Sequence, residues 1–425
     1  MLERTLKPHI EQTSKSFPVL LLTGPRRIGK SVLLSMMKEE KRKYVTLDNL
    51  DDRKMAQEDP EMFLQKYVPP LLIDEVQYAP GLFSYIKIWV DRHKSDYLLH
   101  GKKSANPYGA FWMTGSQKYR LMKGIQESLA GRVAIIDMLG FSYREAIGRP
   151  YDSGPFYPSM EFLHRKPRQQ PAQQTGKKLK LMDVYKLIWK GSFPEIHTIK
   201  NINRNDYYRA YMQTYIDRDV KDFQGLSNEI KFNNFVRAVA VRTGNLLNYN
   251  DLARDCGIDL RTAQVWMNTL ERSGLVYLLR PYFPNVTKRI IKTPKVYFLD
   301  TGLASYLANI DSPEALEASY LSGSILETWA LIEILKSFWH NGMEPLIYFY
   351  RDTNQKEIDF VLEKNMTLYP IEVKKAVSLH GIDTRNFGVL KQLGKNIGTG
   401  AIICLNQDFM PFPKQDIISV PVWEI

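Results

Sequence analysis

The sequence predicts a multidomain α/β protein, and three observations lead to this expectation. Between residues 18 and 136, short apolar runs alternate with helical stretches, which is the pattern of a parallel sheet covered by helices. A mostly helical region follows, and the last part of the chain combines one long helix with several strands. The length of 425 residues corresponds to about two to four domains, each with a core of its own.

The composition is that of a globular protein with a basic balance. Hydrophobic residues make up 44% and charged residues 24%, which excludes global disorder. The net charge of +12 favours a polyanionic partner such as nucleic acid, although a solubilising surface has the same balance.

Only Cys256 and Cys404 are present, too few for a disulfide framework or a cysteine metal site. Because no signal peptide and no run of about 18 apolar residues is evident, we expect a cytoplasmic protein without a membrane partner.

The first 150 residues contain five brief, nearly continuous apolar runs. Such runs are typical of parallel strands, because both faces of a helix-covered sheet are buried. The expected strands are Val19–Thr23, Tyr44–Leu47, Leu71–Asp74, Phe111–Thr114 and Val133–Ile136. Residues 151–181, which follow, are rich in Pro, Gln and basic residues, and we expect a basic flexible insertion or linker there.

A phosphate-binding motif lies between the first strand and a helix expected over residues 31–38. The segment Gly-Pro-Arg-Arg-Ile-Gly-Lys-Ser at 24–31 matches G-x-x-x-x-G-K-[ST]. In this motif backbone N–H groups wrap a β-phosphate, Lys30 reaches the β and γ oxygens, and Ser31 ligates Mg²⁺. ATP and Mg²⁺ are therefore the expected cofactors, since no N-K-x-D element for guanine is present. The expected binding residues are Gly24, Pro25, Arg26, Arg27, Ile28, Gly29, Lys30, Ser31, Val32 and Asp74.

An acidic pair ends the strand at residues 71–74. Asp74 is placed to hold the Mg²⁺ shell, and Glu75 to polarise the attacking water. Another strand ends in Thr114 and Ser116, either of which could sense the γ-phosphate or position water. An ordinary strand-ending turn is the alternative for these two residues.

Phosphoryl transfer usually needs a further cation, and two arginines are candidates. Arg132 follows Leu-Ala-Gly, and Arg218 lies in Tyr-Ile-Asp-Arg-Asp. Either could act in trans within a homo-oligomer. Pairing with Asp217, Asp219 or another surface acid is the alternative.

The middle of the chain predicts a helical extension over 182–245 and a winged helix-turn-helix over 246–292. Tyr208, Tyr211 and Tyr215 recur at helical spacing, a stripe that favours core packing over a ligand site. Asn250 and Asp259 stand where two short helices need caps, with Gly257 between them.

The second of these helices has one apolar and one polar face. Ala263, Val265, Trp266 and Leu270 are expected to face the core, leaving Arg261, Gln264, Asn268 and Arg272 for solvent or DNA. The expected wing contains Lys288, Arg289 and Lys292, which could meet phosphates. DNA and protein both remain open as partners.

The C-terminal region, 293–425, contains an acid followed 13 residues later by E-x-K. Strand alternation would put Glu357, Asp359 and Val361 on one face. A turn at 364–365 would then bring Asp359 to Glu372, so that the two carboxylates could hold Mg²⁺ while Lys374 activates water. Glu327 fits an additional helix acid. An amphipathic hairpin with cross-strand ion pairs is the alternative reading of the same letters.

Taken together, these motifs resemble a known group. Gly-Pro-Arg-Arg-Ile-Gly-Lys-Ser, Leu-Ile-Asp-Glu-Val-Gln, Thr-Gly-Ser-Gln, Leu-Ala-Gly-Arg-Val and Gly-Ser-Phe-Pro-Glu at 191–195 are similar to those of prokaryotic AAA-like P-loop ATPases with a C-terminal domain of unknown function. The resemblance implies an ATP-binding AAA-type core and a C-terminal domain similar to restriction-endonuclease-like (PD-(D/E)xK) nucleases. Two functions follow as expectations. One is an ATPase whose ATP state controls nucleic-acid engagement by the C-terminal domain, and the other is an ATP-gated binding module with an inert nuclease-like domain.

Overall fold

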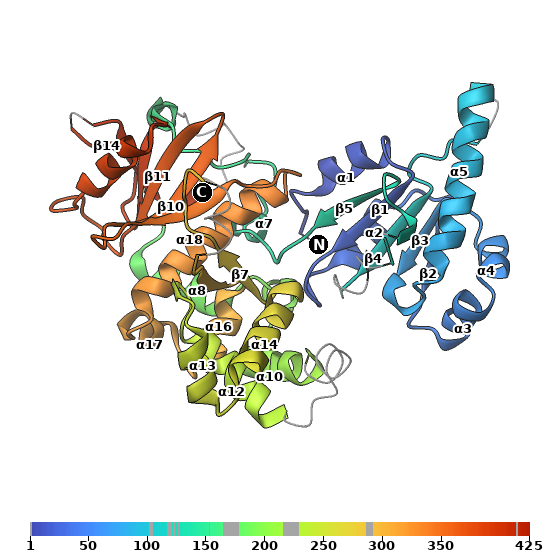
Figure 1. The fold of residues 1–425 in the computed structure, drawn as a ribbon, viewed down its shortest axis with the longest axis horizontal. Coiled ribbons are helices and arrows are strands. Elements are labelled where there is room, and N and C mark those ends of the chain that lie inside the picture. The colour runs from blue at the N-terminus through green and yellow to red at the C-terminus, as the bar shows by residue number, and fades with distance from the viewer. Residues whose placement is uncertain are drawn as a thin grey trace.

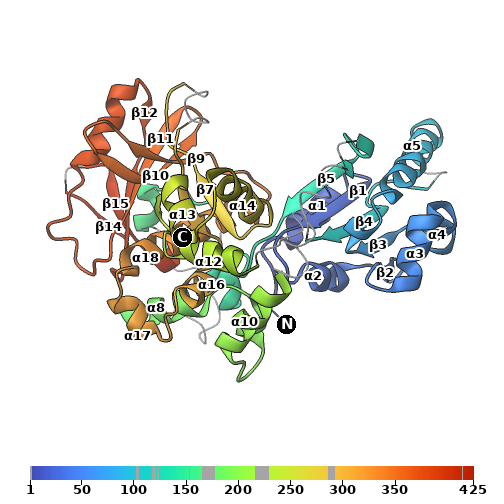
Figure 2. The same ribbon diagram turned by 60° about the horizontal axis from the view of Figure 1, so that its bottom comes forward.

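The structure of the chain is a computed structural model that describes residues 2–101, 105–116, 121, 124–125, 127–152, 154–164, 178–215, 229–285, 292–413 and 415–425. An N-terminal sheet domain lies on one side of the molecule, and a body made of the middle and C-terminal regions lies on the other (Figure 1). The view turned by 60° separates the same two parts (Figure 2).

The N-terminal sheet has five parallel strands in the order β2-β3-β4-β1-β5. They are β1 (Val19–Thr23), β2 (Lys43–Thr46), β3 (Leu71–Asp74), β4 (Phe111–Gly115) and β5 (Val133–Asp137). The predicted parallel sheet is confirmed, and each strand lies within one residue of its expected bounds. Because all strands run the same way, the residues that follow β1, β3 and β4 meet at one edge.

Helices cover both faces of this sheet. They are α1 (Lys7–Ser14), α2 (Lys30–Met37), α3 (Leu50–Glu58), α4 (Pro60–Lys66) and α5 (Leu82–His100). Alternate β1 side chains join different cores: Leu21 packs in a cluster with α3, α4 and α5, whereas Leu22 joins the large cluster that contains α2 and continues into the rest of the molecule. The N-terminal domain therefore shares a core with the body.

The segment after the sheet contains packed residues in its described part, whereas the insertion or linker expected over 151–181 is described only at its two ends. It contains α7 (Tyr143–Ala146) and a 3₁₀ turn, η3 (Met160–His164). Phe156 and Phe162 are buried, and the Tyr157 ring packs 5.2 Å from that of Phe338. Aromatic residues in this stretch thus anchor it to the body, while the basic residues 165–177 lie outside the described part.

The middle region begins with helices α8 (Leu181–Lys190), α9 (Pro194–Thr198), α10 (Arg204–Tyr215) and α12 (Glu229–Ala240). It continues with β6 (Asn245–Leu246), α13 (Tyr249–Cys256), α14 (Leu260–Arg272), β7 (Val276–Leu279), β8 (Lys295–Phe298), α16 (Thr301–Leu307) and α17 (Pro313–Ala318). The three strands form an antiparallel sheet in the order β6-β8-β7. The expected boundary at 292–293 therefore falls between two paired strands, because β8 completes this sheet.

The caps of α13 and α14 and the buried face of α14 can be compared with the expectations from the sequence. The cap of α13 is Asn248, not Asn250, because the Asn248 side chain accepts the N–H groups of residues 250 and 251. Asp259 caps α14 as expected. Val265 is 40% exposed, so it does not face the core; Met267, two residues further along the helix, is buried in its place.

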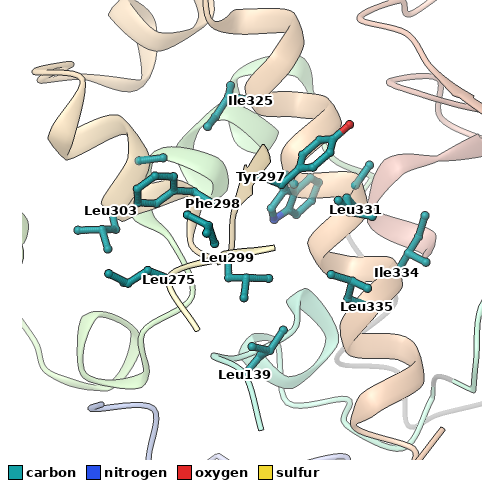
Figure 3. Close-up of a cluster of buried hydrophobic side chains, with 14 of the residues drawn as sticks. Leu139, Leu275, Tyr297, Phe298, Leu299, Leu303, Ile325, Leu331, Ile334 and Leu335 are labelled. Carbon is teal, nitrogen blue, oxygen red and sulfur yellow. The ribbon is translucent and has the colours of Figure 1, made fainter. Parts of the chain in front are cut away.

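The C-terminal region is built on α18 (Ser322–Trp339) and a mixed sheet of seven strands. The strands are β9 (Ile347–Arg351), β10 (Glu357–Lys364), β11 (Thr367–Val373), β12 (Asn396–Ile397), β13 (Gly400–Cys404), β14 (Met410–Pro411) and β15 (Ile417–Pro421). Two 3₁₀ segments, η5 (Arg385–Leu393) and η6 (Val422–Glu424), complete it. Side chains of β8, α16 and α18 share one buried apolar cluster (Figure 3), which fuses the middle and C-terminal regions.

Candidate nucleotide site and C-terminal carboxylate cluster

The loop between β1 and α2 is tightly curled. Gly24, Arg27 and Gly29 all have positive φ, of 140°, 60° and 89°. A Cβ built on Gly24 would lie 2.1 Å from the Met138 carbonyl oxygen, so only glycine fits there. The Lys30 ammonium donates to the carbonyl oxygens of Gly24 and Pro25, at 2.9 and 2.8 Å. The loop is thus folded back on itself at the helix N-terminus.

Asp74 joins this loop to the acidic strand end. Ser31 Oγ donates to Asp74 Oδ1 at 2.6 Å, and the Thr114 hydroxyl donates to the same oxygen. Tyr44 Oη donates to Asp74 Oδ2 at 3.1 Å. Burial, together with the Asp74 carboxylate, raises the pKa of Tyr44 to about 12, so its hydroxyl keeps the proton. A hydroxyl from α2 and a carboxylate from β3 are therefore side by side.

Glu75 follows Asp74 with φ of 55°, a left-handed conformation that is costly for a residue with a side chain. Its carboxylate accepts from the Gln77 amide and, at 3.3 Å, from Ser116 Oγ. Ser116 is buried at the end of β4, as the parallel sheet requires. The structure therefore brings Lys30, Ser31, Asp74, Glu75 and Ser116 to one edge of the sheet.

A cleft of about 1140 Å³ lies against the phosphate-binding loop. The loop, the exposed apolar side of α2 and Glu75 line one wall. Middle-region residues Pro194, Glu195 and His197 line the other, and Arg27 Nη1 lies 3.9 Å from Glu195 Oε2. The sequence predicted no role for these residues, although Pro194 and Glu195 belong to the Gly-Ser-Phe-Pro-Glu motif at 191–195. Their contribution means that the cleft lies between two regions of the chain.

The two candidate arginines have different outcomes. Arg132 makes a two-pronged ion pair with Asp91 of α5, with N···O distances of 2.6 and 2.9 Å. It precedes β5 and so lies at the amino edge of the sheet, opposite the phosphate-binding loop. Arg132 therefore does not act at the phosphate-binding loop of its own chain. Within the chain it pairs with a surface acid, Asp91, as the alternative expectation stated. Arg218 lies outside the described residues.

The loop and the acidic strand fit a nucleotide polyphosphate with Mg²⁺. A Cβ on Gly29 would meet nothing closer than the Pro194 ring at 3.9 Å, so the loop has open space at its last glycine. Lys30 supplies a charge, and the pair of Ser31 and Asp74 supplies oxygen ligands of the kind that Mg²⁺ prefers.

The C-terminal acids are brought together by a hairpin. β10 and β11 pair antiparallel with Phe360 opposite Ile371, around a turn in which Asn365 and Met366 have positive φ. The Val373 N–H donates to Asp359 Oδ2 at 2.8 Å. The expected strict alternation is wrong after Asp359, because a register shift between Ile358 and residue 361 turns Val361 into the core.

Glu327 and Glu372 both interact electrostatically with Asp359. Lys374 Nζ lies 2.5 Å from Glu372 Oε2. Burial, with the Asp359 charge, raises the pKa of Glu327 and of Glu372, while the Lys295 and Lys374 ammonium groups oppose that rise. The four residues expected from the sequence therefore share one cluster. Within the described ranges, however, no three His, Cys, Asp or Glu side chains are arranged so that they could hold a metal ion.

The middle region adds two residues to this cluster that sequence analysis missed. Lys295 Nζ lies 2.6 Å from Glu357 Oε1 and 3.3 Å from Glu327 Oε1, and Tyr297 Oη donates to Glu327 Oε1 at 2.5 Å. Burial disfavours the ammonium, but the carboxylates of Glu327, Asp359 and Glu357 outweigh it and raise the pKa of Lys295. A lysine inside an apolar strand, Lys-Val-Tyr-Phe, is the signal that could have found it.

The polar face predicted for α14 is on the surface. Arg261, Gln264, Asn268 and Arg272 are exposed, and so is Lys292. Lys288 and Arg289 lie outside the described residues. Among the helices that the structure describes, none is long and apolar enough to cross a membrane.

Comparisons with known proteins divide the chain into three parts. Residues 16–147 match the family model "AAA domain", residues 181–314 match "Domain of unknown function (DUF8612)", and residues 322–425 match "Domain of unknown function (DUF4143)". The first 150 residues therefore contain an AAA-type P-loop domain, which at the level of that family supports ATP binding and hydrolysis. The sequence resemblance is confirmed to this extent.

Two relatives are similar over most of the chain. Uncharacterized proteins of Mycobacterium tuberculosis and Mycobacterium bovis are each 26% identical over 362 residues, which is 84% of this chain and 70% of theirs. Among solved structures, a Walker-type ATPase of Pyrococcus abyssi aligns with a TM-score of 0.41 and 14% identity, over 72% of this chain and 96% of that one.

Proposed function

We propose that the protein is a Mg²⁺-dependent ATPase whose nucleotide state controls how the C-terminal half engages nucleic acid. One observation carries the ATPase part: Ser31 Oγ donates to Asp74 Oδ1 at 2.6 Å. This bond joins the end of the phosphate-binding loop to an acidic strand end 43 residues away in sequence. The match of residues 16–147 to an AAA domain supports the same activity.

The chain's own residues suit the steps of hydrolysis. Lys30, Ser31 and Asp74 would hold the nucleotide and its metal ion, together with the N–H groups of the loop. When bound, Mg²⁺ supplies positive charge to the phosphate oxygens. Glu75 orients the attacking water and accepts its proton, while Gln77 and Ser116 keep the Glu75 carboxylate in place.

Substitutions in the loop and at Glu75 test this proposal. Lys30→Ala should abolish both nucleotide binding and phosphate release, because the β and γ oxygens lose their cation. Glu75→Gln should retain binding and lower phosphate release by about a hundredfold or more, because only the base is lost. Phosphate release and binding of a fluorescent nucleotide are measured separately. Glu58→Gln, on the exposed side of α3, is the control. Unchanged turnover in Lys30→Ala would contradict the proposal.

Self-association is part of the same proposal. Arg132 lies too far from its own loop to contact the phosphates, so it would act only on a neighbouring copy, and Arg218 is the second candidate for that role. Nucleic acid, probed as DNA, is the proposed partner of α14. The exposed Arg261, Gln264 and Asn268 side chains and the net charge of +12 support this.

The C-terminal cluster supports strand cleavage as the finer proposal. Asp359 and Glu372 would hold a divalent cation and Lys374 would orient water, and the hydrogen bond from Val373 to Asp359 supports that arrangement. The ion pair of Lys374 with Glu372, and the lack of a three-ligand arrangement within the described residues, favour the alternative of an inert binding domain.

Lys374→Ala separates these two possibilities. Under the cleavage proposal, the variant hydrolyses ATP normally and loses Mg²⁺-dependent cleavage of duplex, branched and single-stranded DNA, because the water-activating ammonium is gone. Lys375→Ala, next to it and exposed, should retain cleavage. If the wild type cleaves none of these substrates, the inert domain is the correct reading.

A further inference from the structure

The C-terminal carboxylate cluster contains a buried cation that belongs to another region of the chain. Lys295 is 4% exposed and lies on β8, which pairs with β6 and β7 of the middle region. Its Nζ reaches Glu357 at 2.6 Å and Glu327 at 3.3 Å. A charge so deeply buried is stable only when it is paired, so these carboxylates and the ammonium depend on one another.

Tyr297, two residues along β8, reinforces this arrangement. Because side chains two residues apart on a strand point to the same face, Lys295 and Tyr297 approach the cluster together. Tyr297 is fully buried, and its hydroxyl donates to the oxygen of Glu327 that also faces Lys295. The Glu327 carboxylate is therefore held from the middle region, although α18 carries it.

The charges of the cluster divide into two halves. On the hairpin side, Glu372 is neutralised by Lys374 at 2.5 Å. On the other side, Glu327 and Glu357 are neutralised by Lys295, with Arg351 3.7 Å from Glu357. Asp359 interacts electrostatically with residues of both halves, Lys295 and Glu372 among them, and accepts a backbone N–H. A divalent cation that binds Asp359 must therefore share its surroundings with the Lys295 ammonium.

We propose that Lys295 is an internal counter-ion that competes with a divalent cation for the carboxylates around Asp359, and so weakens binding of that cation. The inference rests on the proposed cation site at Asp359 and Glu372. Residues of both the middle and the C-terminal regions would then determine the affinity of that site, because Lys295 lies on β8 and the carboxylates lie in the C-terminal region.

Binding of Mn²⁺ to the full chain, measured by titration calorimetry without nucleotide, tests the inference. Lys295→Met keeps the aliphatic stem and removes the charge, so it should bind Mn²⁺ about tenfold more tightly than wild type. If Lys295 only stabilised the fold, Lys295→Met would leave the affinity for Mn²⁺ unchanged or lower it. Lys391→Met is the matched control, because it removes an exposed charge of the C-terminal region that lies outside the cluster. Asp359→Asn, added to Lys295→Met, should abolish the tightened binding.

The outcomes separate the inference from the proposal beneath it. Equal or weaker binding by Lys295→Met would overturn the counter-ion and leave the cation site intact. If neither wild type nor Lys295→Met binds above the Asp359→Asn background, both are wrong, while the ATPase proposal is unaffected. Should Lys295→Met fail to fold, Lys295→Met with Glu357→Gln keeps the charge balance, and it should bind Mn²⁺ more tightly than Glu357→Gln alone.

Discussion

His197 is a buried imidazole beside the nucleotide cleft. Its Nε2 lies 2.8 Å from the Gly191 carbonyl oxygen, to which it donates, and its ring packs edge-on against Phe141. Burial lowers the pKa of His197 to about 4, so the ring is neutral at physiological pH. The short loop of Gly-Ser-Phe-Pro-Glu is thus tied to α9 through an uncharged hydrogen bond.

The His197 environment predicts a pH dependence of stability. Between about pH 6.5 and 4 the unfolded chain binds a proton that the folded His197 does not, so the free energy of unfolding falls as pH falls through this window, by at most about 3 kcal/mol. His197→Gln keeps a donor and should flatten the pH dependence of the thermal midpoint; burial also lowers the pKa of His9 and His340, so some dependence remains. His380→Gln, which is exposed, should change nothing. An unaltered slope in His197→Gln would refute this assignment.

At the scale of elements, the sequence was most informative where burial leaves a simple pattern. The strands of the N-terminal sheet are buried on both faces and read as continuous apolar runs, so their bounds were predictable within a residue. The site residues after β1, β3 and β4 followed from that, because parallel strands end at one edge. β15 (Ile417–Pro421) was not predicted. Prolines at 411, 413 and 421 lie in and around it, and because proline is uncommon inside strands, the sequence there does not indicate a buried strand.

Contacts between elements were the part that the sequence could not supply. Lys295 meets Glu327, 32 residues away, only because β8 packs on α18, and no local pattern encodes that packing. The bulge in β10 likewise depends on how β9 pairs with it. The wing predicted after β7 also has an unforeseen partner, because Tyr282 N donates to Phe349 O and ties this segment to β9.

At the scale of the molecule, α18 joins the C-terminal region to the nucleotide cleft through buried charges. Lys336 is 1% exposed, and its ammonium donates to the carbonyl of Phe141, which lines the cleft, and to Glu333 at 2.9 Å. Glu333 in turn accepts the Tyr143 N–H. A second buried set lies alongside: Arg4 and His340 outweigh the burial of Glu145 and hold its pKa well below the usual range.

Removal of one charge from the buried ion pair of Lys336 and Glu333 should lower the stability of the fold. Lys336→Met leaves Glu333 buried without its partner, and we expect a loss of about 3–5 kcal/mol in the free energy of unfolding, measured with urea. Lys336→Met with Glu333→Gln removes both charges and should recover most of the loss. Lys54→Met, on the exposed side of α3, is the control and should cost less than about 0.5 kcal/mol. A double variant no more stable than the single one would show that the pair is not the cause.

The packing of α18 has a mechanical consequence. Fourteen of its residues are buried, on every side of the helix, and a hydrogen-bonded helix so enclosed hardly shortens along its axis. Lys336, which donates to the carbonyl of the cleft residue Phe141, and Glu327, among the carboxylates, are nine residues or about 13 Å apart on this helix. If a bound nucleotide displaced the Phe141 carbonyl, Lys336 and Glu327 would therefore move together as parts of one rigid helix.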